Sequence, residues 1–213
     1  MQLPRFTAAR KGFTLVEILI STAILAALAA GMWSASAYAK EKGMKNTANS
    51  QVQLLETSLN AYRTDSGGTL PFGKGDMYSS HILYKALFCD EDNNGEPDEV
   101  DGAMMMPYCP SLVVIKNKKD AEQEEGIPVM RYKIEPTKAD GKRISGKFFL
   151  IVDPWGNPYR YRLGYEVEDE KGKTGPGINP DFDIFSLGPD GRGDSKTNSG
   201  DNEDNISNIR SWK

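Results

Sequence analysis

The hydrophobic residues of this chain are unevenly distributed, and the longest apolar stretch lies near the N-terminus. No charged side chain occurs from Ile18 to Ala39, and the apolar residues already begin at Phe13. A helix needs about 20 predominantly apolar residues to cross a bilayer. The pattern therefore predicts a transmembrane helix over residues 13–39, followed by a water-soluble region.

The helical pattern continues beyond the apolar stretch. Over residues 40–65, apolar side chains recur every three or four positions, and polar side chains fill the positions between them. This spacing places the apolar side chains on one face of an amphipathic helix. We therefore predict one long helix whose second half packs on a globular head. The residues of the apolar face are Ala48, Val52, Leu55, Leu59 and Tyr62.

Beyond residue 66 the pattern predicts shorter elements. Residues 79–88 carry apolar side chains about one helical face and predict a short helix. The residues from Asp153 to Pro158 are rich in turn-forming glycine, proline and asparagine. The expected fold class is α+β, with the long helix packed on a small antiparallel sheet. Strands are predicted over 129–134, 147–152, 159–163 and 182–187.

Composition and charge limit the possible partners. The 213 residues carry a formal net charge of −4. Arg5, Arg10 and Lys11 are the only charged residues before Gly12, so the remainder is more acidic than the whole chain. Surfaces that bind DNA or RNA need clustered lysine and arginine. We therefore expect no nucleic-acid partner, and the acidic region suits either a bound cation or solvent.

The residues from Lys11 to Glu17, KGFTLVE, place an acid inside the apolar stretch. A charge costs at least about 2.5–3.5 kcal/mol at the centre of a bilayer. The motif resembles the processing site of type IV pilins and type II secretion pseudopilins. The resemblance implies cleavage after Gly12 by prepilin peptidase, N-methylation of Phe13 and retention of Glu17. The ammonium group of Phe13 and the carboxylate of Glu17 would then neutralise each other, within one chain or between neighbours in a filament.

Two other interpretations of residues 1–39 stay open. A secretory signal could end at Ala37-Tyr38-Ala39, and the mature chain would then begin at Lys40. Alternatively, Glu17 lies in the interfacial zone of a plain anchor helix. Basic residues flank the apolar stretch on both sides and do not set its orientation. The processing motif implies that residues 1–12 are a cytoplasmic leader peptide of a single-pass inner-membrane protein with a periplasmic head.

Two later stretches resemble the major pseudopilin of type II secretion in particular. They run from Asp153 to Leu163 and from Phe182 to Gly191, and the terminal Trp212 adds to them. In this family a calcium ion orders the C-terminal loop, so the resemblance implies such a loop beside the sheet in residues 148–213. Without an ion, this polar segment would be a flexible acidic tail. The implied ligands are the carbonyl group of Leu187, Asp190, and then Asp204 or, as second choice, Asp201.

An acidic loop within residues 66–147 contains a second candidate calcium site. This region is longer than the family core requires, so the resemblance does not define its role. From Asp90 onward, acids or amides stand at positions one, three, five, nine and twelve around a glycine at position six, as in a twelve-residue calcium loop. The backbone carbonyl group of position seven completes the set. A solvated acidic loop is the alternative. The candidate ligands are Asp90, Asp92, Asn94, Glu96, Asp98 and Asp101.

Cys89 and Cys109 bracket the acidic loop and are the only cysteines in the chain. A single bridge is therefore the only intramolecular pairing available. Outside the cytoplasm this disulfide is expected to form, and closing the loop would contribute roughly 3 kcal/mol. Free thiols are the alternative.

The chain shows no catalytic constellation. His81 is the only histidine and no nucleophile motif accompanies it, so we expect a packing or surface residue and no enzyme. The resemblance instead implies a structural subunit that assembles with its own copies into the pseudopilus of a type II secretion system. Minor pseudopilins and the inner-membrane secretion platform would be further partners. A type IV pilus subunit, or a secreted calcium-binding module with a cleavable signal peptide, is the alternative.

Overall fold

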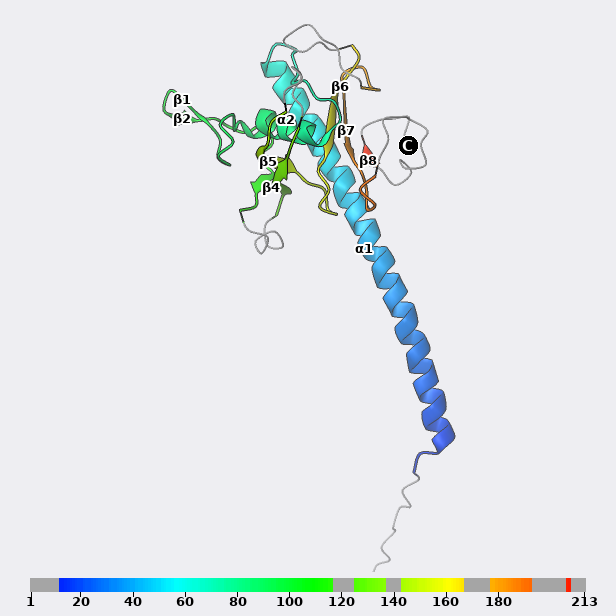
Figure 1. The fold of residues 1–213 in the computed structure, drawn as a ribbon. Coiled ribbons are helices and arrows are strands. Elements are labelled where there is room, and N and C mark those ends of the chain that lie inside the picture. Colours follow the sequence, from blue (N-terminus) through cyan, green and yellow to red (C-terminus); the bar gives the residue numbers. More distant parts are fainter. Residues whose placement is uncertain (1–11, 117–124, 137–142, 167–176, 193–205, 208–213) are drawn as a thin grey trace, which may run out of the picture. The chain divides into compact units, whose positions relative to one another are not determined.

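The structure is a computed structural model that describes residues 12–116, 125–136, 143–166, 177–192 and 206–207, with the backbone alone for residues 31–35. The chain divides into two compact units, Met1–Gly43 and Met44–Lys213. Helix α1 contributes to both units, because it runs from Leu15 to Asp65 without interruption (Figure 1). The predicted long helix is therefore confirmed, with its first residue two positions later than expected.

In the first unit, the described apolar side chains of α1 are exposed. The exposed leucines include Leu15, Leu19, Leu25 and Leu28. Among the described residues, no helix has an apolar stretch long enough to cross a membrane. The transmembrane segment predicted over residues 13–39 is therefore not confirmed and stays a prediction.

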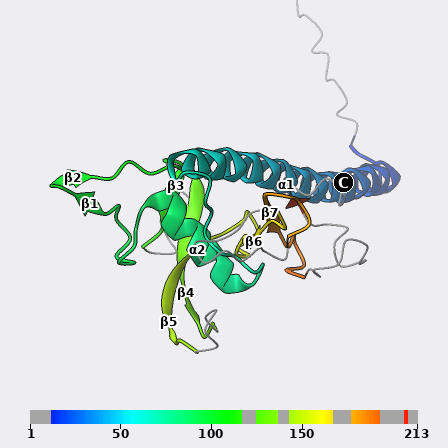
Figure 2. The same ribbon diagram turned by 90° about the horizontal axis from the view of Figure 1, so that it is seen from above.

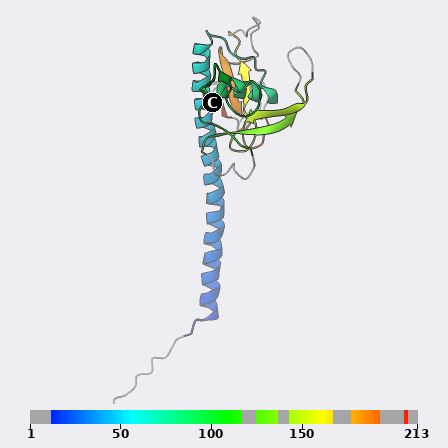
Figure 3. The ribbon, with the colours of Figure 1, turned by 90° about the vertical axis from the view of Figure 1, so that its left-hand side faces the viewer.

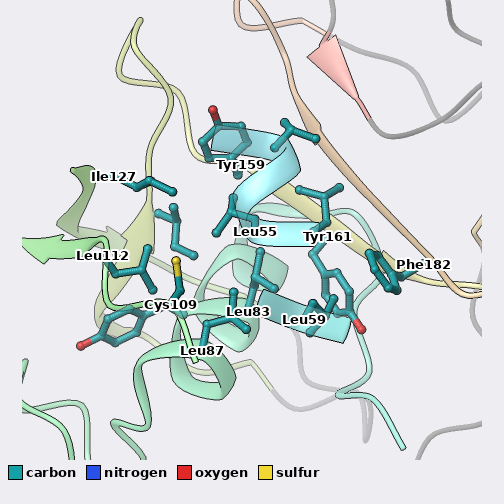
Figure 4. Packing of buried hydrophobic residues seen from close by; sticks show 14 of the residues in the cluster. Leu55, Leu59, Leu83, Leu87, Cys109, Leu112, Ile127, Tyr159, Tyr161 and Phe182 are labelled. Atoms are coloured by element: carbon teal, nitrogen blue, oxygen red, sulfur yellow. The ribbon is translucent and has the colours of Figure 1, made fainter. Parts of the chain in front are cut away.

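The second unit, which we call the head, has its core on the amphipathic part of α1. Four of the five residues predicted for the apolar face are buried, and the fifth, Tyr62, packs against this core at its edge. Leu55 and Leu59 of α1 lie beside Leu83 and Leu87 of the second helix, and Tyr159 and Tyr161 belong to the same core (Figure 4). The amphipathic prediction for residues 40–65 is confirmed where the helix lies in the head.

The second helix, α2 (Met77–Phe88), has a defined cap at each end. The carboxylate of Asp76 accepts a hydrogen bond from the backbone N–H of Ser79 at 2.9 Å, which satisfies one of the free donors at the helix N-terminus. Cys89 ends the helix in the left-handed conformation, with φ of 59°, and its N–H donates to the carbonyl group of Lys85. The helix predicted over residues 79–88 is confirmed and begins two residues earlier, because Asp76 is the cap.

The described strands form three separate sheets. The orders are β1-β2, β3-β4-β5 and β6-β7-β8, and every pair is antiparallel except β3 with β4. Figure 3 shows the larger sheets and α2 on one side of the cyan part of α1. The strands are β1 (Glu99–Val100), β2 (Ala103–Met104), β3 (Leu112–Val114), β4 (Ile127–Ile134), β5 (Gly146–Ile151), β6 (Arg160–Leu163), β7 (Phe182–Ser186) and β8 (Ile206–Ser207).

The four predicted strands correspond to β4, β5, β6 and β7, each within two residues of its predicted bounds. They do not form the single sheet that was expected. The turn from Asp153 to Pro158 carries the chain from β5 into β6. An isolated bridge between Val152 and Pro158 joins its two ends, and the N–H of Tyr159 donates to the carbonyl group of Ile151 at 2.9 Å. The α+β class is therefore confirmed, but the small antiparallel sheet is divided in two and gains one parallel pair.

Candidate functional site

The first turn of α1 contains the residues of the predicted processing site. Gly12 and Phe13 precede the helix, and the Phe13 side chain is 83% exposed. Among the described residues, no group beyond its chain neighbours lies within 4 Å of the position that a Cβ atom would take at Gly12. The peptide bond between Gly12 and Phe13 thus lies in exposed, non-helical backbone. A peptidase can reach such a bond without unwinding α1.

Glu17 is held by a capping box with Thr14. The carboxylate of Glu17 accepts hydrogen bonds from the backbone N–H and the hydroxyl of Thr14, each at 2.8 Å. In return, the N–H of Glu17 donates to the Thr14 hydroxyl at 3.3 Å. These reciprocal bonds satisfy free donors at the start of the helix, and the helix dipole favours an acid there. The sequence T-L-V-E carries this signature, but the role of Thr14 was not recognised from the sequence.

The acidic loop directly follows α2, and the side chain of Asp90 is buried. Its carboxylate accepts hydrogen bonds from the Tyr84 hydroxyl at 2.5 Å, from the N–H of Gly95 at 2.8 Å and from the N–H of Asn94 at 3.0 Å. Gly95 adopts φ of 92° and is packed against the ring of Phe149, so a side chain at this position would be strained. The loop is therefore wrapped around one fixed carboxylate.

Three of the predicted ligands of the acidic loop lie together. Carboxylate oxygens of Asp90, Asp92 and Asp98 are all within 4.8 Å of one another. Calcium binds oxygen atoms at 2.3–2.6 Å, so two ligands of one ion are at most about 5 Å apart. The donor set and its spacing fit a hard divalent cation.

The remaining predicted ligands of the acidic loop are placed differently. Asn94 bridges its neighbours, because its amide donates to Asp92 at 2.9 Å and its oxygen accepts from the N–H of Glu96 at 2.7 Å. The Glu96 side chain pairs with Lys116 at 3.5 Å, which leaves its backbone carbonyl as the predicted ligand. Asp101 does not join the group of three carboxylates. It lies in the turn between β1 and β2, with φ of 54°.

The C-terminal calcium site is described only in part. Leu187 is buried, and Asp190 is exposed with one carboxylate oxygen accepting from the N–H of Arg192 at 2.8 Å. The other predicted ligands, Asp201 and Asp204, lie outside the described residues. This site therefore stays a prediction.

A group of hydrogen bonds that was not predicted from the sequence fixes the turn before Asp190. The buried carboxylate of Asp153 accepts from the Ser186 hydroxyl at 2.5 Å and from the N–H of Asn157 at 2.8 Å. The Asn157 amide in turn donates to the carbonyl group of Gly188 at 2.8 Å. Burial raises the pKa of Asp153, although these hydrogen bonds oppose the shift. The turn from Asp153 to Pro158 thus holds the segment that contains Leu187.

The predicted disulfide is not formed. Cys89 and Cys109 are both free and buried. Cys89 caps α2 in a left-handed conformation, and its thiol faces the carbonyl group of Met106 at 3.8 Å. Cys109 lies in the hydrophobic core, where its thiol is hydrogen-bonded to the side chain of Ser58. The two thiols therefore have different partners, and burial raises the pKa of each.

His81 is a buried packing residue. Its ring contacts Tyr78 and Phe148, and Nδ1 donates to the carbonyl group of Phe149 at 3.1 Å. Burial lowers the pKa of His81 from 6.5 to about 4. The imidazole is consequently neutral at physiological pH, as a core histidine should be.

Comparison with known proteins identifies the class of signal at the N-terminus. Residues 7–33 match the prokaryotic N-terminal methylation motif, so the resemblance of this segment to type IV pilins and pseudopilins is confirmed. The chain is also 40% identical over 52 residues to type II secretion system core protein G of Pseudomonas aeruginosa, a match that covers 24% of this chain and 28% of that protein. No solved structure matches the chain.

Proposed function

We propose that this chain is a structural pseudopilin of a type II secretion system. Prepilin peptidase cuts it after Gly12, Phe13 is N-methylated, and the mature chains assemble into a periplasmic pseudopilus. The observation that carries the proposal is the methylation motif over residues 7–33, with the bond after Gly12 exposed ahead of α1. The similarity to core protein G of a type II secretion system favours secretion over pilus formation.

The exposed apolar side chains of α1 support membrane insertion and assembly. Leu15, Leu19 and Leu25 of α1 are exposed, and the described residues of their own unit do not cover them. A surface of this kind is covered by lipid or by helices of other copies. The proposed location is therefore the bacterial inner membrane, with the head in the periplasm. Minor pseudopilins and the inner-membrane secretion platform are the further proposed partners.

Glu17 has two separable roles in this proposal. The capping box begins the helix, and the negative charge pairs with the ammonium group that cleavage creates at Phe13. Glutamine at position 17 keeps the capping hydrogen bonds, because capping boxes accept glutamine, but it removes the charge. Alanine removes both. Glu17→Gln should therefore leave the helix start intact while preventing assembly.

The first experiment determines the mature N-terminus by mass spectrometry. A chain that begins with methylated Phe13 supports the proposal, whereas one that begins at Lys40 supports a secreted module. Gly12→Val should block cleavage, because glycine is the residue after which the peptidase cuts. Thr14→Ser is the matched control, since it keeps the cap and leaves Gly12 in place. Purified fibres of micrometre length would indicate a type IV pilus subunit instead.

The proposed cofactor is calcium, held by Asp90, Asp92 and Asp98. When bound, the ion neutralises three carboxylates that lie within 4.8 Å of one another and repel each other without it. By resemblance, a second ion is proposed at Leu187 and Asp190. Both ions are structural, and neither takes part in a reaction.

Thermal unfolding of the full chain with calcium and with chelator tests both sites. Calcium should raise the unfolding midpoint, and Asp92→Asn should reduce this increase. Asp101→Asn is the matched control for the acidic loop, because Asp101 lies outside the group of three carboxylates. Asp190→Asn reports on the second site. A midpoint that is identical with calcium and chelator would remove both sites from the proposal.

A further inference from the structure

A hairpin of the head exposes apolar side chains to solvent. Strands β1 and β2 pair Glu99 with Met104 and Val100 with Ala103, and all four residues are exposed. Met105 and Met106 follow directly, and the Met106 side chain is 86% exposed. Residues 99–106 are called the methionine hairpin here, and strands β1 and β2 project from the rest of the head (Figures 1 and 2). Their exposed apolar side chains are therefore not covered by the described part of the chain.

The fold supports the methionine hairpin only at its ends. Asp101 and Gly102, with φ of 54° and 79°, make the tight turn that an Asp-Gly pair favours. At the base, the N–H of Met105 donates to the carbonyl group of Asp98 at 2.7 Å. An isolated two-stranded hairpin is at best marginally stable in water. A surface that covers the methionines would therefore stabilise it.

A groove of about 410 Å³ on the same head is lined mainly by apolar side chains. Strands β3 and β4 form one wall, the turn after Asp153 forms another, and α1 contributes Thr47 and Gln51. Methionine thioethers make favourable contacts with aromatic rings and adapt to irregular apolar surfaces. The apolar residues that line the groove include Val113, Ile115, Pro128, Met130, Val152 and Trp155.

We propose that the methionine hairpin of one copy docks into this groove on a neighbouring copy. No residue of the hairpin lines the groove of its own chain. Two different patches that meet between identical chains make a head-to-tail contact, which can repeat along an open filament. The groove also borders α1 at Thr47, and in the proposed filament α1 lies beside the helices of other copies. This inference rests on the proposed function, because it makes the head contact part of the pseudopilus.

Photochemical cross-linking in cells that form the filament tests the docking. The full chain carries the photoreactive amino acid benzoylphenylalanine in place of Met106. Irradiation should give a dimer in which position 106 is joined to residues 128–130 or 154–156, as located by mass spectrometry of its peptides. Met130→Glu should reduce this dimer at least tenfold. Tyr165→Ser, which alters another exposed apolar side chain of the head, is the matched control and should leave it unchanged.

A second variant, with the photoreactive residue in the groove and the substitutions in the hairpin, gives a test that does not depend on whether Met130→Glu folds. The photoreactive residue replaces Met130, and Met104, Met105 and Met106 all become serine. These side chains are exposed, so the unfolding midpoint should not change while the dimer decreases at least tenfold.

Processed chains that form filaments without the cross-link would overturn the docking alone. The docking would also be overturned if the cross-linked dimer formed equally well after both sets of substitutions. Mass spectrometry of the N-terminus in the same samples separates the two levels, because chains lacking methylated Phe13 would overturn the proposed function and the docking with it.

Discussion

The two parts of helix α1 have the same backbone and opposite surroundings. In the first unit Leu25 is 65% exposed, whereas in the head Leu59 is 0% exposed. Both are leucines in one continuous helix. Hydrogen bonding within the helix therefore does not distinguish them. The difference lies in which side chains of the same chain pack against each part.

The comparison separates stability from assembly. The head buries its apolar face of α1 within its own core, so it requires no second molecule to cover that face. The described apolar side chains of the first unit find no such cover in their own unit. Substitutions in the head should therefore change the free energy of unfolding, and substitutions in the first unit should change association with lipid or other copies.

The largest effect is expected at the buried ion pair of the head. Arg162 of β6 and Asp183 of β7 lie opposite each other in register, and their charged groups are 2.8 Å apart. Both side chains are buried. Asp183→Asn keeps the shape but leaves the charge of Arg162 without its carboxylate, which should lower the free energy of unfolding by about 3–5 kcal/mol. Guanidinium denaturation of the full chain in detergent measures it.

Asp181→Asn provides the control for the buried pair. Asp181 also pairs with an arginine, Arg63, at 2.8 Å, but both side chains are partly exposed. Exposed pairs contribute about 0–1 kcal/mol. Equal losses for Asp181→Asn and Asp183→Asn would contradict the view that burial decides the value of the pair.

Leu59→Ala should have the next largest effect and sharpens the comparison along α1 itself. Removing a buried leucine side chain costs about 2–5 kcal/mol, because it loses apolar burial and leaves a cavity. Leu25→Ala should leave the unfolding midpoint of the head unchanged and reduce the yield of filaments. Both are measured on the full chain, by denaturation and by filament recovery. If Leu59→Ala left the head as stable as wild type but reduced filament yield, Leu59 would act in assembly and not in stability, which would contradict the prediction.

The sequence was most informative where one periodicity extends over many residues. The apolar face at Val52, Leu55 and Leu59 was predicted correctly, because a spacing of three and four over several turns fits only a helix that buries one side. Strands β4 to β7 were placed within two residues for a similar reason. Pairing between segments was not predictable, and the parallel contact of β3 with β4 was missed, because β3 is only three residues long.

The candidate sites were predictable in composition but less so in geometry. The spacing of acids identified Asp90, Asp92 and Asp98, which the fold brings together. Asp101 fits the same spacing, yet Asp101-Gly102 is also a strong hairpin signal, and the backbone forms the turn. The disulfide prediction counted cysteines and could not include the directions of their side chains. The left-handed cap at Cys89 and the core position of Cys109 set those directions.

A smaller effect is expected from His81, and it depends on pH. Its pKa is about 4 in the folded chain and 6.5 when unperturbed, because burial disfavours the charged form. As pH falls from 6.5 to about 4, the unfolded chain takes up a proton that the folded chain does not. The contribution of His81 to the free energy of unfolding is therefore fully present above pH 6.5 and decreases toward pH 4. At 1.36 kcal/mol per pKa unit, the decrease is up to about 3 kcal/mol.

His81→Gln isolates this contribution, because glutamine can donate to the carbonyl group of Phe149 and does not titrate. The raised pKa of Asp153 acts in the opposite direction, so the difference between wild type and His81→Gln is the quantity to measure. That difference should change between pH 6.5 and 4 and be constant above pH 6.5. Parallel pH profiles of the two chains would contradict the assignment.

The smallest effect is expected at Thr14, where the exposed end of α1 has only local support. Losing an N-cap hydroxyl costs about 1 kcal/mol, and this energy acts only on the first turn because the capping bonds join Thr14 and Glu17 alone. Thr14→Val should therefore speed hydrogen exchange at the first amides of α1 by roughly fivefold, as measured by mass spectrometry, without changing exchange in the head. Thr14→Ser should exchange like wild type, since serine restores the hydroxyl. Slower assembly of Thr14→Val than of Thr14→Ser would show that the helix start affects the filament through geometry, because both variants retain the charge of Glu17.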